Sequence, residues 1–319
     1  MTMVATYDTA DGYPLLVDNG TWAFEHGVWK LILIAGHTPR LHWPAMAYDA
    51  FDGYVLLVGD GPRNSTGIEF QSWMYHAGAW TMENLNHTPL RAQPPTNLSG
   101  PSMSYDVRDR AIVLVYGVDA QRGCLGFCPF GITYLYRSGH WWGASGTPAP
   151  FGLGFATTYD AADGYVLMFG YTSTVMGTYG PSSYPEWAGA SNGTWEFSAG
   201  AWTQLHPQTV PPARWLAGLV FDRALGHPVL FGGQAPNGTA LNDTWEWNGT
   251  NWVAFHPSGA VPPRVAFGAL LDSGSVLAFG GITTNTTGTR WGPGLADTWR
   301  LEFPRSSLSG ARWVPMDLH

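Results

Sequence analysis

The sequence predicts an all-β protein, a six-bladed β-propeller with four antiparallel strands in each blade. Three observations predict it: a hairpin pattern that occurs six times, an aromatic pair that follows each hairpin, and a repeat length of about 50 residues. Composition agrees with this fold class, because 41 Gly, 24 Pro and a 14% share of aromatic residues combine turn formers with strand formers. Charged residues make up only 12%, which argues against charged tails and coiled coils.

Each repeat begins with a hairpin. In the clearest copies, Tyr48–Gly59 and Tyr159–Gly170, an aromatic residue, an Asp and a short turn precede an apolar run that ends in Gly. Such a run predicts a second strand that is buried on both faces. The looser copies lie at Tyr7–Val17, Tyr105–Gly117, Phe221–Gly233 and Leu271–Gly281. We expect the Asp of each copy to accept hydrogen bonds from its own turn, as a structural residue. These residues are Asp8, Asp49, Asp106, Asp160, Asp222 and Asp272.

An aromatic residue and a Trp seven positions later follow each hairpin. The pairs are Trp22/Trp29, Trp73/Trp80, Tyr134/Trp141, Trp195/Trp202 and Trp245/Trp252, and the sixth copy widens the interval to Trp299/Trp313. We expect these large rings to pack between blades. The predicted blades of this single domain (1–319) cover approximately residues 1–36, 37–88, 89–147, 148–206, 207–257 and 258–319.

The repeats resemble those of the kelch-repeat, galactose-oxidase-like family of propellers. The resemblance rests on Phe231-Gly-Gly233 and Phe279-Gly-Gly281, on Asn242-Asp-Thr-Trp-Glu-Trp247, and on the Pro-rich segments that end at Arg214 and Arg264. It covers essentially the whole chain and is clearest in the last two repeats. Galactose oxidase binds copper through a cysteine-linked tyrosine, a second tyrosine and two histidines. The ten histidines here show no ligand spacing, so we expect no metal and no cofactor.

Function in this fold is expected in loops carried by the scaffold. The connections between strands 2 and 3, and from strand 4 to the next blade, emerge together around the central channel, and we call this side the loop face. Two long connections between strands 2 and 3, at 171–191 and 282–296, mark it as the predicted site. The expected ligand-binding residues are Arg40, His42, Trp43, Arg63, Tyr184, Trp187, Arg214, Trp215, Arg264, Arg290 and Trp291.

Arginines beside aromatic rings suit carboxylates, sulfates or sugar acids, so the expected partner is a glycan or a protein surface. Arg214 and Arg264 have a second interpretation, as repeat residues that bond neighbouring loop carbonyls. An alternative function is a carbohydrate-active enzyme, of glycoside hydrolase or lyase type, with Glu186 as the acid or base at the channel mouth. A third is a structural module of a larger surface protein.

Charge and hydropathy limit the partners. A net charge of −8 without a basic run argues against nucleic acid. The longest apolar run, near 111–118, is too short to span a bilayer, so we expect no membrane span. We expect a monomer.

The expected location is extracellular or on the cell surface, with a signal peptide absent from this chain and removed. Nine of the eleven asparagines begin a glycosylation sequon, Cys124 and Cys128 are close enough for a local disulfide, and Lys30 is the only lysine. The sequons begin at Asn19, Asn64, Asn86, Asn97, Asn192, Asn237, Asn242, Asn248 and Asn285.

Overall fold

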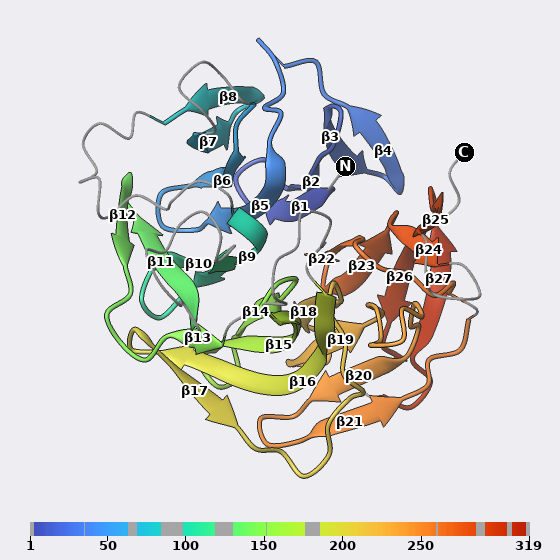
Figure 1. The fold of residues 1–319 in the computed structure, drawn as a ribbon. Coiled ribbons are helices and arrows are strands. Elements are labelled where there is room, and N and C mark those ends of the chain that lie inside the picture. Colours follow the sequence, from blue (N-terminus) through green and yellow to red (C-terminus); the bar gives the residue numbers. More distant parts are fainter. Residues whose placement is uncertain are drawn as a thin grey trace.

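The computed structural model describes residues 3–34, 36–62, 69–83, 98–118, 130–150, 152–175, 186–259, 261–284, 291–304 and 308–316. They form six blades around a central channel, each a path of four antiparallel strands (Figure 1). The predicted all-β, six-bladed propeller is confirmed. Among the described residues, no helix is long and apolar enough to cross a membrane.

The strands follow the repeats. The first three blades contain β1 (Val4–Asp8), β2 (Tyr13–Val17), β3 (Thr21–Glu25), β4 (Val28–Leu31); β5 (His42–Asp49), β6 (Tyr54–Asp60), β7 (Phe70–His76), β8 (Ala79–Met82); and β9 (Leu98–Asp106), β10 (Ala111–Val118), β11 (Phe130–Arg137), β12 (His140–Gly143), with β13 (Ala149–Pro150) added to β11. The last three contain β14 (Ala156–Asp160), β15 (Tyr165–Val175), β16 (Glu186–Ser198), β17 (Ala201–Leu205); β18 (Gly218–Asp222), β19 (His227–Phe231), β20 (Thr244–Trp247), β21 (Trp252–Phe255); and β22 (Gly268–Asp272), β23 (Ser275–Phe279), β26 (Thr298–Glu302), β27 (Arg312–Met316). A separate ribbon, β24 (Ile282–Thr284) with β25 (Trp291–Gly294), extends the last blade.

Every blade is built from one consecutive segment. β1 pairs with β2 in the first blade, and β27 pairs with β26 in the sixth, so no described strand is exchanged where the ring closes. The first strand of each blade lines the channel (Figure 1). These inner strands run from the loop face to the opposite side, which we call the turn face because the turns between strands 1 and 2 lie there.

The blades are joined by their repeated tryptophans. In five of the six junctions, the indole Nε1 of a fourth-strand Trp donates to a Thr hydroxyl in the third strand of the preceding blade. Trp202, for example, lies 2.8 Å from Thr133 Oγ1. The junction between blades one and six has the same bond, from Trp29 to Thr298 at 3.3 Å. The expectation that these rings pack between blades is confirmed.

The repeated aspartates form the turns between strands 1 and 2. Asp8 Oδ1 accepts hydrogen bonds from the backbone N–H of Ala10 (3.0 Å) and Asp11 (3.2 Å), and Gly12 N–H donates to the Asp8 carbonyl. Equivalent side-chain bonds occur at Asp49, Asp106, Asp160 and Asp222. The structural role predicted for these residues is confirmed in the first five blades.

Burial raises the pKa of the five turn aspartates more than their backbone hydrogen bonds lower it. In three of these aspartates, the second carboxylate oxygen, Oδ2, is buried with no hydrogen-bond partner among the described residues. They are Asp49, Asp160 and Asp222. A carboxyl whose pKa is raised on folding stabilises the fold below its unfolded pKa of about 4, and this contribution is lost as pH rises through the folded pKa.

We therefore expect the free energy of unfolding to increase as pH falls from neutrality towards about 5. Urea denaturation at the two pH values, followed by tryptophan fluorescence, measures this. Asp49→Asn should reduce the pH dependence, because the amide keeps the turn bonds and carries no charge. Equal or lower stability at the acidic pH contradicts the prediction.

Candidate functional site

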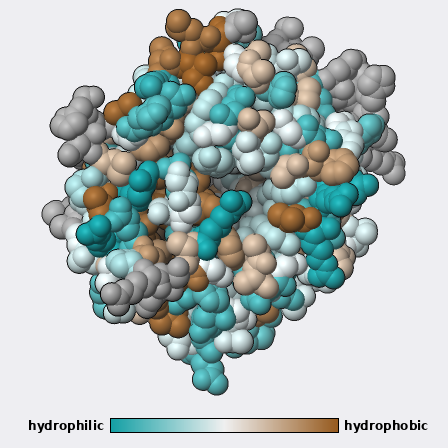
Figure 2. Space-filling view, turned by 180° about the vertical axis from the view of Figure 1, so that it is seen from behind, coloured by the Kyte–Doolittle hydropathy of each residue, from teal (hydrophilic) through white to brown (hydrophobic). Residues whose placement is uncertain are grey.

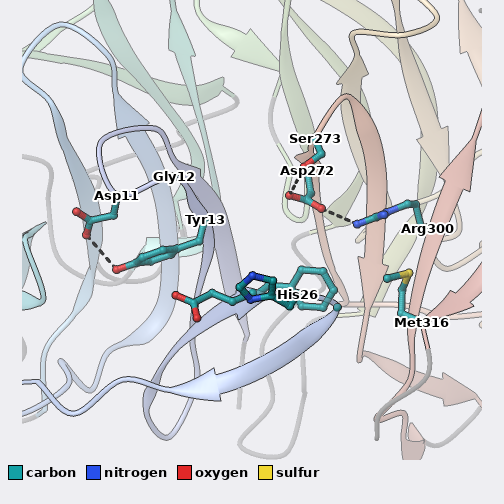
Figure 3. A pocket seen from close by; sticks show the side chains of 11 residues that line it. Asp11, Gly12, Tyr13, His26, Asp272, Ser273, Arg300 and Met316 are labelled. Atoms are coloured by element: carbon teal, nitrogen blue, oxygen red, sulfur yellow. Dashed lines mark hydrogen bonds and ion pairs between the residues drawn. The ribbon is translucent and has the colours of Figure 1, made fainter.

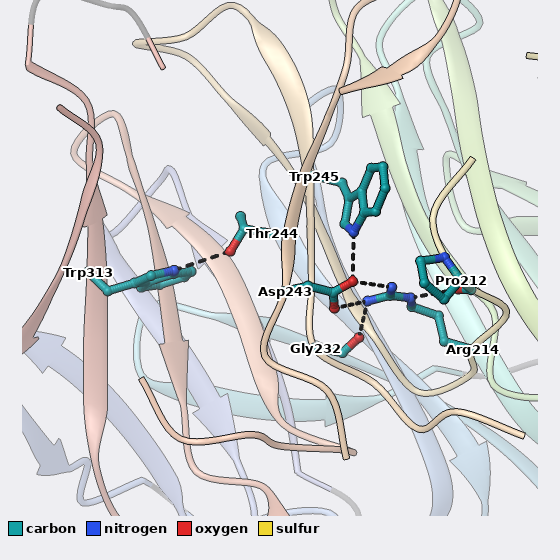
Figure 4. A network of polar contacts seen from close by, with 7 residues as sticks. All are labelled: Pro212, Arg214, Gly232, Asp243, Thr244, Trp245 and Trp313. Carbon is teal, nitrogen blue, oxygen red and sulfur yellow. Dashed lines mark hydrogen bonds and ion pairs between the residues drawn. The ribbon is translucent and has the colours of Figure 1, made fainter. Parts of the chain in front are cut away.

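Two buried arginines organise the loop face. Arg214 precedes β18, and its guanidinium donates to both oxygens of Asp243 at 2.6 Å and to the Gly232 carbonyl at 2.9 Å (Figure 4). Its Nε donates to the Pro212 carbonyl at 3.0 Å. The indole N–H of Trp245 donates to the same Asp243 carboxylate at 2.7 Å. We call this arrangement the arginine clamp, because it ties the connection before β18 to the loop before β20.

The sixth blade repeats the clamp with Arg264, Asp297 and Trp299. Arg214 and Arg264 are both 0% exposed. Burial alone would raise the pKa of Asp243 and Asp297, but the hydrogen bonds and charge of the arginines outweigh it and hold each pKa below its usual value. These placements favour the interpretation of both arginines as repeat residues, because their donors are used within the protein.

The inner strands begin with an unusual backbone. Trp43 (φ 49°), Leu216 (φ 53°) and Ala266 (φ 50°) have a left-handed backbone conformation six residues before the repeated Asp of their blades. At the same position in two other blades, Gly100 and Gly154 also have positive φ. Leu216 N–H donates to the Gly154 carbonyl at 3.0 Å, and Ala266 N–H donates to the Leu216 carbonyl at 3.3 Å. These bonds link neighbouring blades around the loop-face mouth. Residues other than Gly seldom adopt this backbone conformation, so contacts with the surrounding structure must stabilise it.

Three predicted site residues, all exposed, lie just before and at the start of β5: Arg40, His42 and Trp43, of which Trp43 is 48% exposed. The same connection carries Leu33, which is 92% exposed. The β4–β5 connection projects from the top of the propeller in Figure 1, and hydrophobic residues gather at that edge in the reversed view of Figure 2. Trp215 is half-buried, and its backbone pairs with Gln234.

Other predicted residues lie outside the described part of the structure: Arg63, Tyr184, Arg290, Cys124 and Cys128. The side chains of Glu186, Trp187 and Trp291 also lie outside it, although their backbones are in β16 and β25. Their functional roles, the disulfide and the enzymatic alternative therefore stay predictions.

The two predicted long loops are partly strand. β15 continues to Val175 and β16 begins at Glu186, so much of the segment predicted as a loop at 171–191 is a β-ribbon. The β24–β25 ribbon likewise occupies part of the predicted loop at 282–296. The correction at the first loop has a local cause, because Tyr171-Thr-Ser-Thr-Val175 is rich in strand-forming residues.

The larger channel cavity opens on the turn face, opposite the predicted site. It has a volume of about 680 Å³, and we call it the vestibule. Its lining includes a ring of six residues, which we call the rim: the residue that precedes the repeated Asp in each blade, namely Tyr7, Tyr48, Tyr105, Tyr159, Phe221 and Leu271. A smaller cavity of about 170 Å³ lies towards the loop face, and the two share lining residues such as Met46, Met103 and Leu219. The larger of the two cavities is therefore the one that the tyrosines line.

The vestibule offers aromatic rings and neutral hydroxyl groups. Burial raises the pKa of Tyr48, Tyr105 and Tyr159, and the nearby aspartates of the turns add to the effect. These phenols stay protonated at neutral pH. Arg223 is the only charged residue among the described residues that line the cavity. Such a lining suits an uncharged ligand that combines ring faces with hydroxyl groups.

No cluster of three or more His, Cys, Asp or Glu side chains suited to a metal ion occurs among the described residues.

Comparison with known proteins identifies the fold. No family model and no curated protein sequence matches the chain. Among 304 matching chains of solved structures, one titled "Structure of YjhT" has a TM-score of 0.62, with 99% of this chain and 97% of that chain covered at 12% sequence identity. The chain therefore shares its six-bladed propeller fold with a solved structure, and at this identity the likeness concerns the fold alone.

The vestibule was not anticipated as a site. The repeat pattern does contain its rim, as the aromatic or aliphatic residue before each Asp, and four of the six positions are Tyr. Hydroxylated rings at a repeated position that faces a propeller channel are the signal that could have identified it.

Proposed function

We propose that this protein is an extracellular or cell-surface binding propeller that holds an uncharged glycan in the vestibule. The observation that carries the proposal is the cavity of about 680 Å³ with four tyrosines on its rim and one charged residue among the described residues of its lining. Its volume is within the usual range for small-molecule sites, roughly 300 to 1,000 Å³. Sugar rings have apolar faces that stack on aromatic side chains and hydroxyl groups that bond to Tyr and Thr hydroxyls.

A second candidate is binding of a protein surface by the loop face, as the sequence predicts. It is supported by exposed apolar residues at the end of β4, in the β4–β5 connection and at the start of β5: Leu31 (53%), Leu33 (92%) and Trp43 (48%). Exposed apolar groups gathered in one segment are typical of interaction sites.

Two observations support the proposed kelch-repeat membership and the proposed extracellular location. The arginine clamps occur in the two blades whose repeats most resemble the kelch pattern, which supports kelch-repeat membership. The described sequon asparagines are all exposed, as glycosylation requires. They are Asn19, Asn192, Asn237, Asn242 and Asn248.

Tyr105→Ala is expected to weaken glycan binding about tenfold to hundredfold, because it removes a stacking face and a hydroxyl from the rim. A glycan array that contains neutral and acidic oligosaccharides provides the ligand, and calorimetry with the best neutral hit measures the change. Trp142→Ala is the control, because Trp142 is 37% exposed on β12, a fourth strand far from the channel.

Two results separate the candidates. A loss of binding in Trp43→Ala with none in Tyr105→Ala would transfer the site to the loop face. A protein that binds only acidic glycans contradicts the proposed ligand class.

A further inference from the structure

A second pocket lies on the turn face at the junction of blades six and one. Its volume is about 590 Å³, and it is lined by Asp11, Phe24, Glu25 and His26 of the first blade and by Asp272, Arg300 and Met316 of the sixth, among others (Figure 3). Among the described residues, it shares only Ser273 with the lining of the vestibule. We call it the junction pocket.

Three other junctions contain a tyrosine ring at the corresponding place. Tyr13 begins β2, pairs in register with Asp8, and its hydroxyl lies 3.1 Å from the hydroxyl of Tyr75 in the next blade. Tyr54 occupies the same position in blade two and contacts Tyr136 at 2.8 Å. In blade four, Tyr165 accepts a hydrogen bond from the indole of Trp247 at 2.9 Å. A phenol from the second strand therefore bridges to an aromatic residue of the third strand in the following blade.

The sixth blade lacks this phenol. Its turn is shorter, so Asp272 pairs in register with Ser275, which takes the position of Tyr13, Tyr54 and Tyr165. The aromatic partner is nevertheless present in the next blade. Phe24 stands two residues after Trp22, as Tyr75 stands two residues after Trp73. The junction pocket thus opens beside Phe24, where three other junctions have a tyrosine ring, while blades three and five have Ala111 and His227 at this position.

The polar groups of the pocket also match a phenol. In blade one, the Tyr13 hydroxyl donates to Asp11 Oδ2 at 3.0 Å. In the junction pocket, Glu25 and Asp272 supply carboxylate acceptors; Glu25 Oε2 also accepts from Lys30 at 3.0 Å, and Asp272 pairs with Arg300 at 2.7 Å. The turn aspartates of blades two, four and five instead leave one oxygen buried without a partner among the described residues. The sixth blade is therefore specialised at this point, with a fixed ion pair on the wall of an open pocket.

We infer that the junction pocket binds a phenolic ring, either free or as the tyrosyl side chain of a peptide. The ring packs against Phe24, and its hydroxyl donates to one of the pocket carboxylates. Glu25 pairs with Lys30 at 3.0 Å and Asp272 pairs with Arg300 at 2.7 Å, so the charge of Asp11 is left unbalanced among the described residues of the pocket. An anionic ligand is therefore disfavoured. The inference is independent of glycan binding in the vestibule.

The test uses 4-methylphenol, the tyrosine side chain itself, with toluene as the probe that lacks the hydroxyl. Binding is followed by NMR of ¹³C-methyl methionine, with the Met316 signal assigned from Met316→Leu. We expect a saturable shift of Met316 with a dissociation constant on the order of millimolar, as is usual for so small a ligand, and binding by toluene at least about tenfold weaker.

Ser275→Tyr should abolish the shift, because the introduced ring should extend towards Phe24 of the next blade, as Tyr13 extends to Tyr75 and Tyr54 to Tyr136, and occupy the pocket. Ser275→Ala is the matched control and should bind as the unchanged protein does. Equal binding of toluene, an undiminished shift in a folded Ser275→Tyr variant, or no shift at tens of millimolar would overturn the inference. If Ser275→Tyr does not fold, the comparison of 4-methylphenol with toluene in the unchanged protein decides.

N-acetyltyrosinamide identifies the source of the ligand. Tighter binding than that of 4-methylphenol indicates a peptide, and weaker binding indicates a free phenol.

Discussion

Trp141→Ala is expected to lower the free energy of unfolding by about 3 to 5 kcal/mol, the range for removal of a large aromatic ring from a core. Trp141 is 2% exposed. Its ring centroid lies 4.8 Å from that of Tyr136 in its own blade and 5.8 Å from that of Phe70 in the preceding blade. The substitution would leave a cavity between two sheets, each of which is fixed by its own hydrogen bonds. The sheets therefore cannot move together enough to replace the lost contacts.

The neighbouring residue provides the control. Trp142 belongs to the same strand but is 37% exposed, so Trp142→Ala should cost less than about 1 kcal/mol. Urea denaturation of both variants, followed by circular dichroism, measures the difference. If the two variants have the same midpoint, the fourth-strand tryptophans do not hold the blades together as the repeated contacts indicate.

The repeats determine what could be read from the sequence. The six hairpins and the aromatic pairs are periodic, and each repeated residue has one local role, since Asp8 accepts turn N–H groups and Trp202 fills the wedge between two blades. Such roles follow from short-range chemistry and from the period, so blade number and strand number were predictable.

The candidate site depended on relations that the sequence does not display. From the sequence, Arg214 could be assigned to a ligand or to neighbouring loop carbonyls, but not to its partner Asp243, which lies 29 residues further along the chain. The vestibule arises only when six residues from six inner strands face one channel. The junction pocket lies where Ser275 takes the position of a tyrosine, and this replacement is recognised only when the turns are aligned by their strand pairing.

Asp243→Ala is expected to destabilise the protein by about 3 kcal/mol, because it leaves the buried guanidinium of Arg214 without its carboxylate. Arg214 is 0% exposed, and two of its hydrogen bonds end on Asp243 at 2.6 Å. The value is at the lower end of the usual range because the side chain of Asp243 is 31% exposed, so water partly replaces it. The pKa of Asp243 is lowered in the folded state, so the contribution of the pair is present at neutral pH and is lost as pH falls through that folded pKa.

The exposed pair Arg312–Glu302 is a matched control for the arginine clamp. Two nitrogens of Arg312 donate to Glu302 at 2.9 and 2.8 Å, but the arginine side chain is 58% exposed. Glu302→Ala should therefore cost less than about 1 kcal/mol at neutral pH. The double variant Arg214→Met/Asp243→Leu should recover part of the stability lost in Asp243→Ala, because it removes the unpaired charge along with its partner. Urea denaturation of the three variants gives the comparison. If Asp243→Ala costs no more than Glu302→Ala, Arg214 does not depend on its internal partner, and its guanidinium again becomes a candidate for ligand binding on the loop face.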